Sequence, residues 1–277
     1  MFWSRVWPVT APLPTESMAS RASLARDFRR LGLNAGDTVL VHASLRSLGW
    51  VCGGATGVVL ALTDVLGREG CLIVPAQTPD NRDPSRWENP RVPESMWDEI
   101  RDHILPFDPK RSPALAMGLI AEQVRTWPGA IRSRHPQTSF AGIGPAAEKL
   151  LATHELSCQL GHESPLGALY RADARFLLLG VGFDRCTAFH LAEYNLPGQV
   201  TRTNRCVVRK RGQRRWVEYQ DIDLNAGDFA ALGNDFENDR SVSVGTVGSA
   251  TARLASVRDA VSYAEGWFMK NRHRTPS

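Results

Sequence analysis

The chain has 277 residues, of which 43% are hydrophobic and 22% charged, an ordinary composition for a globular protein and a length compatible with one large α/β unit. Its formal net charge of +4 is too small to indicate a nucleic-acid partner, and no apolar run approaches the roughly 18 residues of a membrane span. The N-terminus lacks the apolar stretch of a secretory signal, and the five cysteines show no CxxC spacing. We therefore expect a cytoplasmic protein with reduced thiols and no metal, monomeric or homodimeric, with neither a nucleic-acid nor a membrane partner.

Residues 1–17 are predicted to be a tail outside the fold, because the segment that starts at Met18 resembles a natural start. The remainder, 18–277, shows no internal repeat and no linker that would divide it. A single domain is the simplest expectation for it.

Helical and strand patterns alternate through the first 200 residues. Between them, residues 77–93 carry four prolines and no periodicity, which predicts a long loop of functional importance. The alternation predicts an α/β fold with a mostly parallel central sheet flanked by helices. Helices are expected at 23–33, 57–67, 93–104, 114–127, 145–154 and 187–196, strands at 37–44, 70–76 and 175–182, and a turn followed by a short strand within 135–144.

The pattern changes after residue 200. Residues 205–224 resemble two strands around Arg211-Gly212, which predicts an inserted antiparallel β-hairpin. A strand at 241–248 and a closing helix at 256–270 are expected to follow.

Charge is segregated along this last part of the chain. Residues 202–215 contain seven basic side chains and no acid, whereas residues 218–239 contain seven acids and no base. One interpretation is two solvated faces that partly neutralise each other. The alternative is an acidic pocket wall for a cationic ligand.

His190 and Glu193 lie three residues apart in a predicted helix and so share one face of it. The helix follows a strand and a Gly-Val-Gly turn, which places its first turns near the carboxyl end of that strand, where open α/β sheets bind ligands. An imidazole there can accept a proton from a nucleophile at neutral pH. A satisfied structural histidine is the competing interpretation.

The segment from Val41 to Gly54 is the second candidate. Its strand ends near His42 and is followed by small residues, hydroxyls, an arginine and glycines, which is typical of a phosphate or oxyanion cradle. It is not a GxxxxGK[ST] loop, so ATP chemistry is not indicated.

Other chemistries are disfavoured. The Gly-Val-Gly turn lacks the third glycine of a dinucleotide fingerprint, since Arg185 occupies that position. Cys186, four residues before His190, is a conceivable nucleophile, but a buried free cysteine is usually inert. There is neither a GxSxG elbow nor an HExxH motif.

Several of these segments together resemble the aminoglycoside 3-N-acetyltransferases of the antibiotic N-acetyltransferase superfamily. The matching stretches occur in the family's order and span about residues 20 to 270; they are 36–54, 107–150, 164–170, 177–193, 221–223 and 245–254. The resemblance implies a fold unlike that of GCN5-type acetyltransferases. It also implies acetyl transfer from acetyl-coenzyme A, the co-substrate, to the 3-amino group of a 2-deoxystreptamine aminoglycoside, which confers antibiotic resistance.

The resemblance also assigns roles to residues. His190 matches the family's general base, with Glu193 beside it as the second catalytic residue, and the cationic substrate is expected to contact Asp80, Asp221 and Asp223. Two segments match regions that hold the coenzyme, and their residues are His42, Ser44, Leu45, Arg46, Ser47, Leu48, Gly49, Ser139, Phe140 and Ala141. Two alternatives stay open: an acetyltransferase of the same superfamily that acts on another amine, and a catalytically silent ligand-binding relative.

Overall fold

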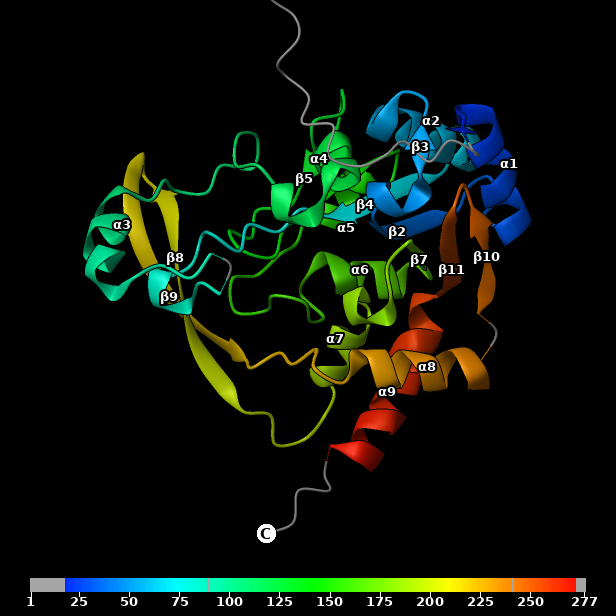
Figure 1. Ribbon diagram of the computed structural model, residues 1–277. Coiled ribbons are helices and arrows are strands. Elements are labelled where there is room, and N and C mark those ends of the chain that lie inside the picture. The colour runs from blue at the N-terminus through cyan, green and yellow to red at the C-terminus, as the bar shows by residue number, and fades with distance from the viewer. Residues whose placement is uncertain (1–17, 89, 241, 273–277) are drawn as a thin grey trace, which may run out of the picture.

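The computed structural model describes residues 18–88, 90–240 and 242–272. The expectation of a tail at residues 1–17 therefore lies outside the described residues. The prediction of one domain from residue 18 onward stays a prediction. Helices pack on both sides of a central sheet, and a long hairpin projects from one end (Figure 1).

The central sheet has seven strands within the described residues, in the order β10-β11-β7-β2-β4-β6-β5. The three strands in its middle, β7-β2-β4, pair in parallel, whereas the outer pairings are antiparallel. The α/β class is thus confirmed, and the sheet is mixed, with partial parallel character. The strands are β2 (Thr38–Ala43), β4 (Cys71–Pro75), β5 (Ile131–Arg132), β6 (Phe140–Ile143), β7 (Arg175–Leu179), β10 (Ser243–Val247) and β11 (Ala250–Ser256).

Side chains alternate between the two faces of the sheet and seed two separate cores. Leu177 and Leu179 of β7 belong to one core, and Phe176 and Leu178 to the other. The first core is covered by α1 (Arg21–Leu31), α2 (Gly54–Leu66) and α4 (Leu119–Arg125), and the second by α5 (Ala147–Leu151), α6 (Pro165–Arg171), α7 (Phe189–Glu193), α8 (Phe229–Asp239) and α9 (Val257–Asn271).

Most expected elements are present, with shifted bounds. The helix expected at 114–127 is divided into η4 (Leu115–Met117) and α4, because Gly118 between them adopts a φ of 90°. Four elements were not expected: strands β5 and β11, helix α6, and helix α8 within the acidic stretch. The remaining short elements are β1 (Met18–Ala19), β3 (Trp50–Val51), η1 (Leu45–Leu48), η2 (Pro84–Arg86), η3 (Glu94–Met96), η5 (Phe183–Arg185) and α3 (Trp97–His103).

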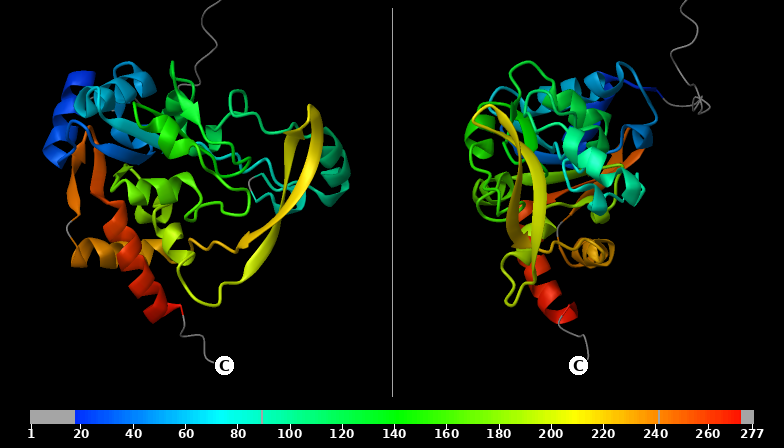
Figure 2. Two further views of the ribbon diagram at one scale, coloured as in Figure 1. Left: turned by 180° about the vertical axis from the view of Figure 1, so that it is seen from behind. Right: turned by 90° about the vertical axis from the view of Figure 1, so that its left-hand side faces the viewer.

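The inserted hairpin is present as predicted. Strands β8 (Thr201–Lys210) and β9 (Gln213–Ile222) pair along their whole length around Arg211 and Gly212, whose φ angles of 51° and 79° suit a two-residue type I′ turn. The hairpin stands apart from the central sheet and lies against α3, as both Figure 1 and Figure 2 show. The Trp216 indole N–H donates to the Arg101 carbonyl at 3.0 Å and so joins hairpin to helix.

Candidate active site

A cleft of about 780 Å³ opens at the carboxyl edge of the parallel strands. β2 and β7 are neighbours, and the Ser44 N–H donates to the Leu179 carbonyl at 2.9 Å, so the loops that follow the two strands leave the sheet side by side. This is the edge at which α/β sheets bind ligands. The first loop contributes His42, Ser44, Leu45 and Arg46 to the lining, and the second contributes Val181, Asp184, Arg185, Cys186, Thr187 and His190.

His190 and Glu193 form a close polar contact at this cleft. The His190 Nδ1 atom lies 2.6 Å from Glu193 Oε2, and the two side chains are 16% and 2% exposed. Because a carboxylate only accepts hydrogen bonds, Nδ1 carries the proton and Nε2 is left as the basic nitrogen. The Phe229 ring lies against the imidazole, with ring centroids 4.6 Å apart. The pair is thus held in the geometry of a general base and its orienting carboxylate.

The other carboxylate oxygen of Glu193 also accepts close hydrogen bonds. Its Oε1 accepts hydrogen bonds from Arg272 Nη1 at 2.5 Å and from the Asn225 backbone N–H at 3.0 Å. Arg272 also binds Asp228 at 2.6 Å, and its guanidinium lies over the Phe268 ring. Sequence reasoning missed Arg272, because it stands 79 residues from Glu193 and follows the last helix with no motif to mark it.

Cys186 lines the same cleft but is fully buried, and burial raises the pKa of its thiol to about 12. A thiol with such a pKa is protonated at neutral pH, and the thiolate is the nucleophilic form. The site therefore does not favour a cysteine nucleophile.

His42 is a buried side chain at the end of β2, also in the cleft lining. Its Nε2 atom has no hydrogen-bond partner among the described residues. Burial, followed by repulsion from His190 and Arg185, lowers the pKa of His42 to about 4, so the ring is neutral near pH 7. A neutral imidazole with an unused nitrogen can bind a ligand carbonyl or hydroxyl.

The residues expected to hold the coenzyme divide into two groups. Four of them (His42, Ser44, Leu45 and Arg46) line the cleft with His190. The Ser47 hydroxyl donates to the Gly180 carbonyl at 2.9 Å, and Leu48 is buried beside Gly49, whose φ is 77°. The segment at 139–141 is internal: Ser139, Phe140 and Ala141 are all 0% exposed, and their neighbour Thr138 lines the cleft instead.

The three aspartates expected at the substrate are not brought together in the cleft lining. Asp80 is exposed in the loop after β4, and Asp223 pairs with Arg202 at 2.9 Å. Asp221 is 5% exposed, and its Oδ2 accepts from the Gln159 N–H at 2.7 Å and the Tyr194 hydroxyl at 2.9 Å. Asp221 thereby fixes Gln159, which itself lines the cleft.

The rest of the acidic stretch is also engaged elsewhere, which favours the interpretation of mutual neutralisation over an acidic pocket wall. Glu218 pairs with Arg205 across the hairpin at 3.0 Å. On α8, Glu237 binds Arg253 and Asp228 binds Arg272, while Asp235 and Asp239 accept from Trp267 and Tyr263 at 2.7 Å each.

The described part of the chain contains no group of three or more His, Cys, Asp or Glu side chains arranged to hold a metal ion. In the same residues, no helix is both long enough and apolar enough to cross a membrane.

A histidine held by a carboxylate at the carboxyl edge of an α/β sheet is typical of an enzyme active site. The family model of aminoglycoside 3-N-acetyltransferases matches residues 40–269, and the chain belongs to this family. Acetyl-coenzyme A is accordingly its co-substrate.

The individual relatives agree with this assignment. The chain is 42% identical, over 91% of its length and 93% of the relative's, to the SPbeta prophage-derived aminoglycoside N(3')-acetyltransferase-like protein YokD of Bacillus subtilis (strain 168). The crystal structure of YokD superposes with a TM-score of 0.90 over 93% of this chain and 96% of that one, at 41% identity. Aminoglycoside N(3)-acetyltransferase VII of Streptomyces paromomycinus is 34% identical over 92% of this chain and 93% of the relative. A structure of AAC-IIIb binary with CoASH has a TM-score of 0.83 and 31% identity, over 94% of this chain and all of that one.

Proposed function

We propose that this protein transfers the acetyl group of acetyl-coenzyme A directly to an amine, with His190 as the general base. The observation that carries the proposal is the 2.6 Å contact between His190 Nδ1 and Glu193, which leaves Nε2 free to accept a proton in a cleft of about 780 Å³.

The reaction needs a base because an alkyl amine is mostly protonated near pH 7 and only its neutral form attacks a thioester. The amine nitrogen forms a bond to the thioester carbonyl carbon and gives its proton to His190 Nε2. The tetrahedral intermediate then breaks its C–S bond, and the sulfur takes up the proton from His190 Nε2, which restores the base. The products are an N-acetyl amide and free coenzyme A thiol.

Other residues of the cleft have supporting roles in this proposal. Glu193 stabilises the imidazolium that forms, and Arg272 holds the carboxylate in its orientation. The backbone N–H groups of Leu45 and Arg46 open the short helix η1 and so have no helical acceptor. Donors of this kind at a developing oxyanion each contribute about 3 kcal/mol to transition-state binding.

Two classes of acceptor amine are compatible with this chemistry. The 3-amino group of a 2-deoxystreptamine aminoglycoside is supported by family membership and by the names of the relatives. An amine of another kind is supported by the lining itself, in which Glu88 and Asp184 are the acids and Arg46, Arg82, Arg185 and Arg202 the bases. A polycation would gain little from such a lining.

The test is release of free coenzyme A thiol from acetyl-coenzyme A in the presence of a panel of amines that includes several aminoglycosides. We expect turnover with at least one amine, and a fall of about 10²- to 10⁴-fold in His190→Ala. His103→Ala, at an exposed histidine on α3, is the matched control and should keep full activity. Undiminished turnover in His190→Ala would contradict the assignment of the base.

A further inference from the structure

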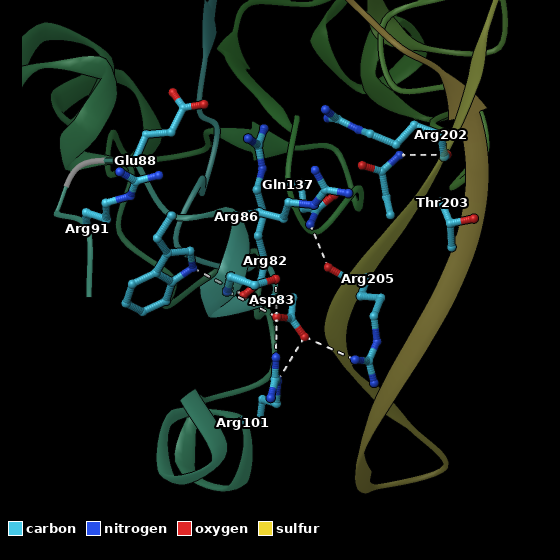
Figure 3. Close-up of a pocket in the computed structure, with 13 residues that line it drawn as sticks. Arg82, Asp83, Arg86, Glu88, Arg91, Arg101, Gln137, Arg202, Thr203 and Arg205 are labelled. Atoms are coloured by element: carbon cyan, nitrogen blue, oxygen red, sulfur yellow. Dashed lines mark hydrogen bonds and ion pairs between the residues drawn. The ribbon is translucent and has the colours of Figure 1, made fainter. Parts of the chain in front are cut away.

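A second cavity, of about 450 Å³, adjoins the active-site cleft, since Arg82, Glu88 and Arg202 line both. We call it the arginine pocket because six of its lining side chains are arginines: Arg82, Arg86, Arg91, Arg101, Arg202 and Arg205. The loop that carries the first three faces strand β8, which carries the last two (Figure 3). The pocket also contains two carboxylates, those of Asp83 and Glu88.

The walls of this pocket are fixed to each other by buried polar contacts. The Asn81 side chain donates to the Val207 carbonyl at 3.0 Å and accepts from the Val207 N–H at 2.8 Å. Gln137 Nε2 donates to the carbonyls of Asn81 at 2.7 Å and Arg205 at 2.9 Å. The loop and strand β8 therefore hold their side chains in a constant relation, as preorganised recognition requires.

Half of the arginines are already neutralised. Asp83 receives Arg101 at 2.9 Å and Arg205 at 3.1 Å, as the dashed lines in Figure 3 show. Arg202 pairs with Asp223 at 2.9 Å, but these side chains are 38% and 44% exposed, so the pair is weak and open to exchange.

The uncompensated charge lies on the loop. Among the described residues, no carboxylate forms an ion pair with Arg82, Arg86 or Arg91. Arg82 is half-buried at the junction of the two cavities, where burial and repulsion from Arg202 lower the pKa of its guanidinium. An arginine remains charged in spite of such a shift. Glu88 attracts this charge without forming an ion pair with it, and its attraction is outweighed by burial.

We propose that Arg82 and Arg202 bind an anionic group of the acceptor, a carboxylate or a phosphate, so that the substrate is an anionic amine instead of a polycation. This inference rests on the proposed acetyl transfer to an amine. Guanidinium groups bind carboxylate and phosphate oxygens by paired, charge-assisted hydrogen bonds. The ligand's anion replaces Asp223 as the partner of Arg202 and gives Arg82 a directly bonded anionic partner.

The test compares acceptors that differ in the anion alone: glucosamine 6-phosphate with glucosamine, and β-alanine with its amide, beside an aminoglycoside. The full-length protein and acetyl-coenzyme A are used, and kcat/KM is measured by thiol release. We expect the anionic member of at least one pair to be favoured tenfold or more. Faster acetylation of the aminoglycoside or of the members that lack the anionic group would overturn the inference and leave the proposed function intact.

Two variants test whether Arg82 and Arg202 bind the anionic group of the acceptor. Arg82→Gln and Arg202→Gln should each raise KM for the anionic acceptor about tenfold, with KM for acetyl-coenzyme A changed less than twofold. Arg82→Lys keeps the positive charge, and it tests whether a rise in KM in Arg82→Gln comes from misfolding. Arg26→Gln, on the exposed side of α1, is the matched control. A parallel rise in KM for acetyl-coenzyme A would assign the arginines to the coenzyme's phosphates and overturn the inference.

Direct binding separates this inference from the proposed function. Calorimetric titration of glucosamine 6-phosphate and β-alanine into the protein needs no turnover. Binding that weakens in Arg82→Gln but survives in His190→Ala supports the anion site even if no amine is acetylated. No measurable binding of either anionic amine, with no acetylation of either, would overturn it.

Discussion

Helix α7 and strand β8 both reach the active-site cleft, yet their charged side chains are held in different ways. On α7, Glu193 is 2% exposed and has a partner on each oxygen. On β8, Arg202 is 38% exposed and its carboxylate partner Asp223 is 44% exposed. The neighbouring Arg205 is 41% exposed and has one exposed partner, Glu218, beside the buried Asp83. A buried, fully satisfied contact fixes one geometry, whereas exposed pairs contribute about 0–1 kcal/mol and re-pair readily. The comparison assigns the chemistry to α7 and the choice of acceptor to β8 with its facing loop.

On the α7 side of this comparison, we expect the largest effect on activity from Glu193→Gln. The amide keeps the shape but presents an N–H₂ group either to Arg272 or to His190 Nδ1. In the latter case the proton moves to Nε2, which then no longer accepts one. We expect kcat to fall by about 10²-fold or more with KM for either substrate nearly unchanged. Steady-state kinetics check this, and a change confined to KM would show that Glu193 binds the acceptor instead.

On the opposite wall, Asp83→Asn should affect stability and acceptor binding more than chemistry. The Asp83 carboxylate is 7% exposed and joins Arg101 of α3 to Arg205 of β8. Its loss removes the buried partner of both arginines and leaves them only the exposed carboxylates of Asp98 and Glu218. We expect the free energy of unfolding to fall by about 1–3 kcal/mol, measured by urea denaturation. Asp98→Asn is the control, since that carboxylate is 95% exposed and should contribute less than about 0.5 kcal/mol.

The same carboxylate predicts a pH dependence. Burial opposes its ionisation, but hydrogen bonds from Arg101 and Ser85 outweigh burial and lower the pKa of Asp83 to about 2. Since the folded pKa lies below the unfolded value of about 3.9, the stabilisation is complete above pH 4 and is lost as the pH falls toward 2. Denaturation midpoints of Asp83→Asn and of the unchanged protein should therefore converge over that interval. A constant difference between them would contradict the role given to the ionised carboxylate.

The smallest effect is expected for Cys186→Ala. The thiol is fully buried with a pKa raised to about 12, so direct transfer makes no use of it. Activity should stay within a few-fold, with a loss of stability of about 1 kcal/mol from the small cavity. Trapping of an acetylated Cys186 by mass spectrometry would contradict direct transfer.

Local patterns predicted much of this molecule. The alternating segments identified the three parallel strands, and Arg211-Gly212 marked the hairpin turn. The i, i+3 spacing also anticipated the contact between His190 and Glu193. All of these depend on residues close together in the chain.

The features that the sequence did not predict depend on contacts between residues distant in the chain, or on hydrophobic patterns that neighbouring residues obscure. Strand β11 is rich in small residues, so its apolar signal is weak although it pairs on both sides within the sheet. In α8, Phe229, Leu232 and Phe236 have helical spacing, but the surrounding acids suggested a binding wall. The partners of those acids, and the role of Arg272, are contributed by segments remote in sequence.

The contact between Arg272 and Glu193 has a consequence for biosynthesis. A nascent chain that has folded as far as β11 contains the histidine and its carboxylate, but the second carboxylate oxygen has no cation until residue 272 has left the ribosome. Helix α9 must then pack against α7 to deliver the guanidinium, a step that follows the rest of the sheet in order of synthesis. The contacts of the His190–Glu193 pair are thus complete only when helix α9 has packed against α7, so the activity that we propose depends on closure of this part of the fold.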